Sequence, residues 1–285
     1  MKILTPAERL IVAADFKPDP TKQQGRQWVF YKVLAMADSL KGTGVYLKVN
    51  SALRSYGYDL IGEIQLRGLR VFADLKLIDI GETLATDGVL LRQTKPELLT
   101  TVCTAGNSAL QALKAELPDT EVLGVTVLTD VTEDESNRTY GMTGIQAACM
   151  MLAAKAVKAG LGGIISSANE AEMVRRVVGT NMTINTPAIR PKWAMVAGDD
   201  QNPARSRTPA EAIKAGADRI VVGRPIVRAE NPRDAVMRTI EEIASAVAEI
   251  GKRQDCPSCP TCGHTTVRNG ACFKCLNCGE SVGCS

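Results

Sequence analysis

Eight short apolar segments rich in β-branched residues recur through the first 225 residues of this 285-residue chain, and helix-like segments separate them. Most are nearly continuous hydrophobic runs, which is typical of parallel strands covered on both faces. The predicted strands are residues 10–15, 45–50, 70–76, 98–104, 121–129, 162–166, 182–187 and 219–223. Eight strand and helix units in about 250 residues match a (β/α)8 TIM barrel in number and size.

Helical periodicity completes the predicted barrel. The predicted helices are residues 25–40, 55–67, 82–93, 105–116, 144–159, 168–178, 209–215 and 232–250. A doubly wound open sheet is the alternative, but residues 15–18, Asp-Phe-Lys-Pro, replace the glycine-rich turn that would bind a dinucleotide. We therefore predict an α/β chain with a barrel over residues 1–250. A polar break at residues 251–255 predicts a linker, so residues 251–285 form a separate tail.

Composition excludes several classes of chemistry and partner. The only histidine is His264, so residues 1–250 lack a Ser-His triad and the common His-ligated zinc sites. The net charge is +3, and residues 251–285 hold four basic residues against two acidic ones, so the barrel lacks the charge of a nucleic-acid-binding domain. No apolar run approaches the roughly 18 residues that span a bilayer. We expect a soluble, cytoplasmic protein without a membrane partner.

Charged side chains gather at the ends of the first three predicted strands. Asp74 and Lys76 share one strand face, because side chains alternate with period two, and both are expected in the barrel mouth. Asp15 and Lys48 end two other strands, and Asp79 follows three residues after Lys76. Barrel enzymes place their chemistry at this end. The structural alternative is that Asp15 and Lys48 are rim residues and that Asp79 and Glu82 cap a helix.

These residues resemble a known family. Residues 74–83, Asp-Leu-Lys-Leu-Ile-Asp-Ile-Gly-Glu-Thr, are similar to the DxKxxDIxxT signature of orotidine 5′-phosphate decarboxylases, which are (β/α)8 enzymes. Further matches follow in order over roughly residues 8–245. They are Asp15, Lys48 within Tyr-Leu-Lys, Thr-Val-Leu-Thr at 126–129, Thr-Pro-Ala-Ile-Arg-Pro at 186–191, Asp-Asp-Gln at 199–201 and Val-Gly-Arg-Pro-Ile at 222–226.

The resemblance implies decarboxylation of orotidine 5′-phosphate to UMP in pyrimidine biosynthesis, with no cofactor. The implied catalytic residues are Lys48, Asp74, Lys76 and Asp79, and Lys76 would protonate C6 of the pyrimidine. The implied substrate-binding residues are Asp15, Thr83, Thr129, Asp130, Pro187, Gln201, Gly223 and Arg224. The resemblance also implies a homodimer in which Asp79 and Thr83 reach the partner's site. Residues 190–208 have little apolar periodicity, which is consistent with a lid over the phosphate.

Three positions depart from the family pattern. Asp130 stands where the family usually has a serine that contacts the pyrimidine, Ala188 replaces a usual glycine, and Cys103 replaces a common histidine. Two alternatives therefore stay open. One is a related sugar-phosphate decarboxylase or aldolase that uses Mg²⁺, and the other is a non-catalytic nucleotide-binding scaffold. Cys103 is expected to be a small buried hydrophobic residue rather than a nucleophile.

The tail carries seven of the nine cysteines. Two Cys-x-x-Cys-Gly motifs, Cys259 with Cys262 and Cys275 with Cys278, have the spacing of a four-cysteine structural zinc site. About 30 residues bury too little apolar surface to fold alone, so metal binding would supply the folding energy; disulfides are the alternative.

Other features of the tail leave its ligands and its partner open. The leftover groups are Cys256, Cys272, Cys284 and His264. Cys256 and Cys272 could exchange with the motif cysteines as ligands, and Cys284 could be a redox-active thiol. The pattern resembles the C-terminal zinc ribbon of cobalamin-dependent ribonucleotide reductases. Arg268 and Lys274 form only a weak basic surface, so a nucleic-acid partner is not expected but stays open for the ribbon.

Overall fold

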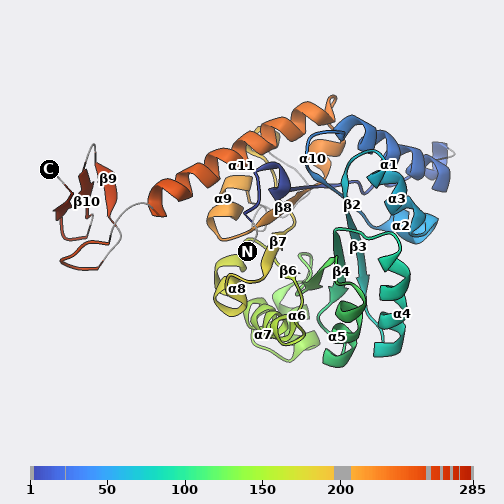
Figure 1. Cartoon of the computed structure of the whole chain (residues 1–285), viewed down its shortest axis with the longest axis horizontal. Coiled ribbons are helices and arrows are strands. Elements are labelled where there is room, and N and C mark those ends of the chain that lie inside the picture. Colours follow the sequence, from blue (N-terminus) through green and yellow to red (C-terminus); the bar gives the residue numbers. More distant parts are fainter. Residues whose placement is uncertain are drawn as a thin grey trace. The chain divides into compact units, whose positions relative to one another are not determined.

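The computed structural model describes residues 3–22, 24–195, 207–254, 258–263, 266–269, 272–275 and 277–283. Eight parallel strands close into a barrel in chain order, with β1 paired to both β2 and β8. They are β1 (Leu10–Ala13), β2 (Tyr46–Val49), β3 (Arg70–Leu77), β4 (Leu98–Val102), β5 (Glu121–Val125), β6 (Gly163–Ile165), β7 (Thr183–Thr186) and β8 (Arg219–Val222). The predicted (β/α)8 barrel is confirmed, and Figure 1 shows its helices around the strands.

The strands form because both of their faces are buried. Side chains that alternate inward fill the barrel with one apolar cluster, to which Ile11, Tyr46, Phe72, Leu123 and Val221 contribute. The outward side chains of the same strands are covered by helices, so the strands read as continuous apolar runs. This packing leaves the carboxyl ends of the strands free to carry polar side chains.

The helices differ from the predicted set at three places. The observed ones are α1 (Arg26–Leu40), α2 (Ser51–Tyr56), α3 (Asp59–Gln65), α4 (Gly81–Arg92), α5 (Asn107–Glu116), α6 (Glu133–Tyr140), α7 (Ile145–Lys158), α8 (Ala171–Val178), α9 (Pro209–Lys214), α10 (Arg224–Val227) and α11 (Pro232–Gln254). The single helix predicted at 55–67 is wrong, because Gly57 at φ +85° ends α2 before α3 begins. The polar α6 lacks an apolar stripe and escaped prediction, although Thr132 and Glu135 form a capping box at its start. The four-residue α10 was also missed.

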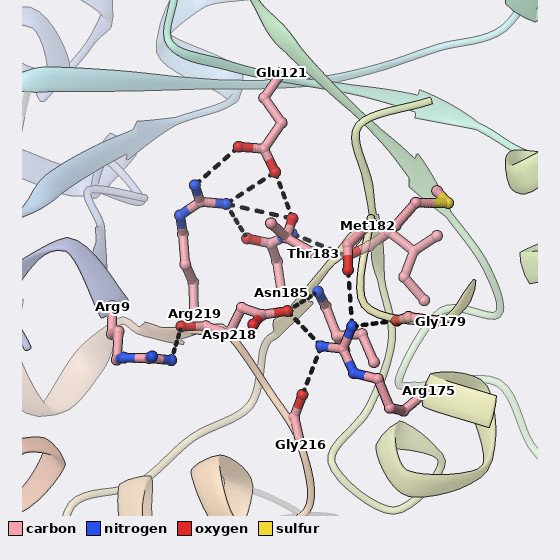
Figure 2. Close-up of polar contacts among 12 residues, drawn as sticks. Arg9, Glu121, Arg175, Gly179, Met182, Thr183, Asn185, Gly216, Asp218 and Arg219 are labelled. Carbon is pink, nitrogen blue, oxygen red and sulfur yellow. Dashed lines mark hydrogen bonds and ion pairs between the residues drawn. The ribbon is translucent and has the colours of Figure 1, made fainter. Parts of the chain in front are cut away.

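A polar network lies at the opposite end of the barrel from the strand carboxyl ends (Figure 2). Arg219 and Glu121, the first residues of β8 and β5, pair inside the barrel. Arg175 donates to Asp218 and to the carbonyl oxygens of Gly179 and Gly216, which joins the turns at the starts of β7 and β8. Charged pairs therefore fill this end of the barrel.

The tail follows α11. This helix continues to Gln254, past the polar break expected at residue 251, because Lys, Arg and Gln are good helix formers. By its internal contacts the chain divides into residues 1–243 and 244–285. The second unit contains an antiparallel sheet of β9 (Val267–Asn269), β10 (Cys272–Lys274) and β11 (Ser281–Val282). Among the described residues, no helix combines the length and the apolarity that crossing a membrane requires.

Candidate active site

A cavity of about 500 Å³ opens at the carboxyl ends of the barrel strands. Barrel loops and strand ends meet there, and enzymes of this architecture place their active sites at this end. Eight of the residues that the sequence predicted for the site line it: Asp15, Lys48, Asp74, Lys76, Thr129, Pro187, Gly223 and Arg224. The structure thus brings together residues from strand ends that lie more than 200 positions apart in the chain.

Four charged side chains alternate in sign along one wall of this cavity. Lys48 Nζ lies 2.6 Å from Asp15 Oδ2 and 3.1 Å from Asp74 Oδ2. Lys76 Nζ lies 2.7 Å from Asp74 Oδ1. Asp74 is therefore held between two ammonium groups, and its side chain is only 9% exposed. We call Asp15, Lys48, Asp74 and Lys76 the charged array.

Lys48 and Asp74 stay ionised although both side chains are buried. Burial acts to lower the pKa of Lys48, but the negative charges of Asp74 and Asp15 outweigh it and raise that pKa above its usual value. Burial acts in the opposite direction on Asp74, and the positive charges of Lys48 and Lys76 outweigh it and lower the pKa of this carboxyl. At neutral pH both Asp74 and Lys48 are therefore charged.

An irregularity in β3 sets the positions of Asp74 and Lys76. The pairing register with β4 shifts between Ala73 and Leu77, so three residues of β3 lie opposite Thr100. Lys76 has φ +51°, in the left-handed region that side chains other than glycine rarely adopt. Side chains replace the missing ladder bonds: Arg54 donates to the carbonyl oxygen of Leu75 over 3.0 Å. The bulge thereby lets Asp74 and Lys76 meet in the cavity.

The match to known proteins covers the whole barrel. The family described as "Orotidine 5'-phosphate decarboxylase / HUMPS family" matches residues 8–239. The chain belongs to this family. The orotidine 5'-phosphate decarboxylase of Methylobacterium radiotolerans is 34% identical over 245 residues, covering 85% of this chain and 99% of that protein. That of Alkalilimnicola ehrlichii is 37% identical over 218 residues, covering 74% and 91%.

Solved structures agree with this assignment to the orotidine 5'-phosphate decarboxylase / HUMPS family. The crystal structure of orotidine 5'-phosphate decarboxylase from Lactobacillus acidophilus matches with a TM-score of 0.66 at 25% identity, covering 83% of this chain and 99% of that one. The family match ends at residue 239, so the cysteine-rich tail lies outside it.

Three residues predicted from the family signature do not line the cavity. Asp79 and Thr83 are exposed in and after the loop between β3 and α4, and Asp130 is exposed beside Thr129. The helix cap that was the structural alternative for Asp79 is absent: α4 begins at Gly81 without a side-chain cap, and Asp79 Oδ1 accepts from the neighbouring backbone N–H of Ile80 over 2.7 Å. Gln201 lies outside the described residues, as does most of the predicted lid.

The structure also describes the two other positions that depart from the family pattern, Cys103 and Ala188. Cys103 is fully buried, and burial raises the pKa of its thiol to about 12, so it packs as an apolar residue, as predicted. Ala188 has φ +62°, the conformation for which the glycine usual in the family is best suited. The ion pairs of the charged array form with both residues in place.

Sequence reasoning missed three polar residues around the array. Thr100, in β4, donates to Asp74 Oδ1 over 2.9 Å. Asn50 and Ser167 line the cavity; Asn50 Nδ2 lies 3.5 Å from Asp74 Oδ2, and Ser167 accepts a hydrogen bond from the N–H of Asn169. Period-two alternation from Leu98, Lys48 and Ile165 places all three on inner faces, so that signal was present in the sequence.

The four cysteines of the two tail motifs converge on one point. The Sγ atoms of Cys259, Cys262, Cys275 and Cys278 all lie within 4.8 Å of one another, and none of the four is in a disulfide. Tetrahedral zinc with Zn–S bonds of about 2.3 Å separates its sulfur ligands by about 3.8 Å. The closest sulfur pairs are 3.4 and 3.5 Å apart, so the cluster fits one such ion. Cys256, Cys284 and His264 lie outside the described residues.

Proposed function

We propose that this chain decarboxylates orotidine 5′-phosphate to UMP with its own side chains and no cofactor. The observation that carries the proposal is the charged array, in which two lysines and two aspartates form three successive ion pairs of 2.6–3.1 Å in the cavity of a barrel of this family. The cavity of about 500 Å³ is of a size that holds a nucleotide.

Lys76 is the proposed proton donor. Breaking the bond between C6 and the carboxylate releases CO₂ and leaves an electron pair on C6, so a fixed cation beside C6 stabilises the developing charge. The Lys76 ammonium then transfers one proton to C6, which gives UMP and a neutral amine that solvent protonates again. Its side chain is 29% exposed towards the cavity, so solvent can reach it. Asp74 holds this ammonium in place, Lys48 in turn holds Asp74, and Asp74 faces the substrate carboxylate.

The remaining lining residues are proposed to bind the nucleotide. Arg224 supplies a forked donor for the phosphate, and Gly223 lets the backbone approach it. Gln201 is proposed as a further phosphate donor. Thr129 and Pro187 are assigned to the pyrimidine, and Asp15 to the ribose. Asp130 is proposed at the outer edge of the pyrimidine site, where its exposure separates its charge from the substrate carboxylate.

Asp79 and Thr83 are proposed to act across a homodimer interface. Both are exposed, neither lines the cavity of its own subunit, and the capping role that would explain Asp79 is absent. Ile78 and Ile80 flank Asp79 and are 55% and 70% exposed, which is unusual for isoleucine. An apolar surface around a charged residue is consistent with an interface that carries Asp79 towards a partner's array.

The tail is proposed to be a zinc ribbon held by the four clustered cysteines. Bound zinc would link the two motifs and supply the folding energy that about 30 residues lack. Thiolate ligands persist in a reducing compartment, and Cys103 and Cys149 of the barrel form no disulfide, which supports the cytoplasm as the place of the reaction.

One assay tests the enzyme proposal directly. The absorbance of orotidine 5′-phosphate is followed with purified protein, with and without a chelator, and with the Lys76→Ala variant. We expect turnover that the chelator does not change and a loss of at least about 100-fold in kcat for Lys76→Ala, with UMP still bound. A folded protein without turnover would overturn the proposal, and turnover of a sugar phosphate that requires Mg²⁺ would favour the other branch of the family.

A further inference from the structure

Thr100 connects the two catalytic residues of β3 through one hydroxyl group. Its Oγ1 lies 2.9 Å from Asp74 Oδ1 and 2.9 Å from the backbone nitrogen of Lys76. An amide nitrogen only donates, so Oγ1 accepts from Lys76 and its single hydrogen points to Asp74. The direction of both hydrogen bonds is therefore fixed, and Thr100 is fully buried.

The contact with Asp74 restricts the rotation of the carboxylate. The terminal torsion of an aspartate is broad, so a carboxylate held only by flexible lysine side chains can turn. Lys48 lies on Oδ2 and Lys76 on Oδ1, and Thr100 adds a donor on Oδ1 from a rigid strand. These three donors, together with Asn50 Nδ2 at 3.5 Å from Oδ2, define the plane of the carboxylate.

The contact with Lys76 holds a backbone conformation that is otherwise unfavourable. A left-handed conformation is unfavourable for a residue with a side chain. The register shift leaves the Lys76 N–H without a ladder partner on β4, and the Thr100 hydroxyl takes the place of that partner. The same hydroxyl thus fixes the start of the lysine side chain whose other end contacts Asp74 at 2.7 Å.

We propose that Thr100 is a positioning residue that fixes the Lys76 ammonium and the Asp74 carboxylate relative to each other for proton transfer to C6. The proposal rests on the proposed function and extends it to a residue that does not line the cavity. A hydroxyl that acts only on geometry should affect kcat far more than substrate binding.

The neighbouring residue provides a matched control. Thr101 is also fully buried, and its hydroxyl donates to the carbonyl oxygen of Leu77 over 2.8 Å, on the other side of the same bulge. Within the part of the chain that the structure describes, the Thr101 hydroxyl bonds to Leu77 and not to the charged array. Thr100→Val and Thr101→Val each remove one buried hydroxyl that supports β3, but only the first removes a contact with Asp74.

The kinetic experiment compares Thr100→Val, Thr100→Ser and Thr101→Val. We expect Thr100→Val to lower kcat by about 10- to 100-fold while the Kd of UMP changes by less than about threefold. Thr100→Ser keeps the hydroxyl and should recover most of the activity, and Thr101→Val should stay within about threefold of the wild type. Equal losses in the two valine variants, or a kcat for Thr100→Val within about threefold of wild type, would overturn the proposal.

A second measurement separates this proposal from the proposed function. In protein labelled with ¹³C at aspartate carboxyl carbons, the Asp74 signal is identified as the one that Asp74→Asn removes. Loss of the Thr100 hydrogen bond should move the titration midpoint of that signal to higher pH, and Thr101→Val should not. If the wild type does not decarboxylate orotidine 5′-phosphate, the proposed function fails while this shift still tests the contact. An unchanged midpoint in Thr100→Val would overturn the inference whatever the activity.

Discussion

Arg219 and Glu121 form a two-point ion pair across the end of the barrel that lies away from the cavity. Arg219 Nη1 is 3.0 Å from Oε1 and Nη2 is 2.8 Å from Oε2. The side chains are 5% and 23% exposed, and Asn185 accepts a further hydrogen bond from Nη1 over 3.1 Å (Figure 2). Because β5 and β8 are not neighbours in the sheet, the pair links opposite parts of the barrel wall.

Removing one member of this pair should destabilise the fold and leave the chemistry intact. Glu121→Gln leaves the Arg219 charge buried without its counter-charge, and we expect a loss of about 3–5 kcal/mol in the free energy of unfolding. Urea denaturation measures that loss, and kcat well below the transition should be unchanged. The control is Glu116→Gln, which breaks the more exposed pair with Arg92 and should cost less than about 1 kcal/mol. Equal losses would contradict the stabilising role.

The charged array should make stability depend on pH at both ends of the range. The pKa of Asp74 is lowered in the fold, so its contribution is present above the ordinary value of 3.8 and is lost as pH falls through the folded-state value. The pKa of Lys48 is raised, so its contribution is present below 10.5 and is lost as pH rises through the folded-state value.

Denaturation of two variants over a range of pH checks both signs. The difference in the free energy of unfolding between wild type and Asp74→Asn should shrink below pH 3.8. The difference between wild type and Lys48→Met should shrink above pH 10.5. Differences that stay constant over these ranges would show that the two groups do not titrate as proposed.

Ala188→Gly should stabilise the protein. Ala188 has φ +62°, where a Cβ atom costs about 1–2 kcal/mol, so its removal stabilises the folded state. Glycine also gives the unfolded chain more conformational freedom, which offsets part of this stabilisation. The expected net gain is about 0.5–1 kcal/mol in the free energy of unfolding. Ala153→Gly within α7 is the control and should lose about 1 kcal/mol. A loss of stability in Ala188→Gly would contradict the assigned conformation.

The sequence was sufficient to predict the barrel and most members of the charged array. All eight strands were predicted, because burial on both faces produces long apolar runs that periodicity detects. Asp15, Lys48 and Asp74 end or lie in such runs, so their convergence follows from the architecture. The boundaries were too long where a strand leads into the cavity: β5 ends at Val125, although the apolar run continues to Thr129.

The remaining features of the site depended on contacts between strands, which a single sequence does not reveal. Lys76 was expected on a regular strand face, yet it reaches the cavity through a bulge and has a positive φ. No residue type at positions 73–77 indicates such a bulge. Thr100 lies in an ordinary strand, and its role follows only from the register shift opposite it. Asp79 was grouped with the array by spacing, but the loop leaves it exposed. Distances across strands, rather than patterns along one strand, decide these cases.

Removing the metal should unfold the tail and spare the barrel. The purified protein should contain about one zinc per chain, since four thiolates complete one tetrahedral site. A strong chelator, or Cys278→Ser, should release the zinc and abolish amide protection in β9, β10 and β11, because these short strands depend on the metal for folding. Turnover should persist, since the array lies in the other compact unit. Cys149→Ser in α7 is the matched control and should retain the zinc; a wild-type tail that is equally protected without metal would refute the zinc ribbon.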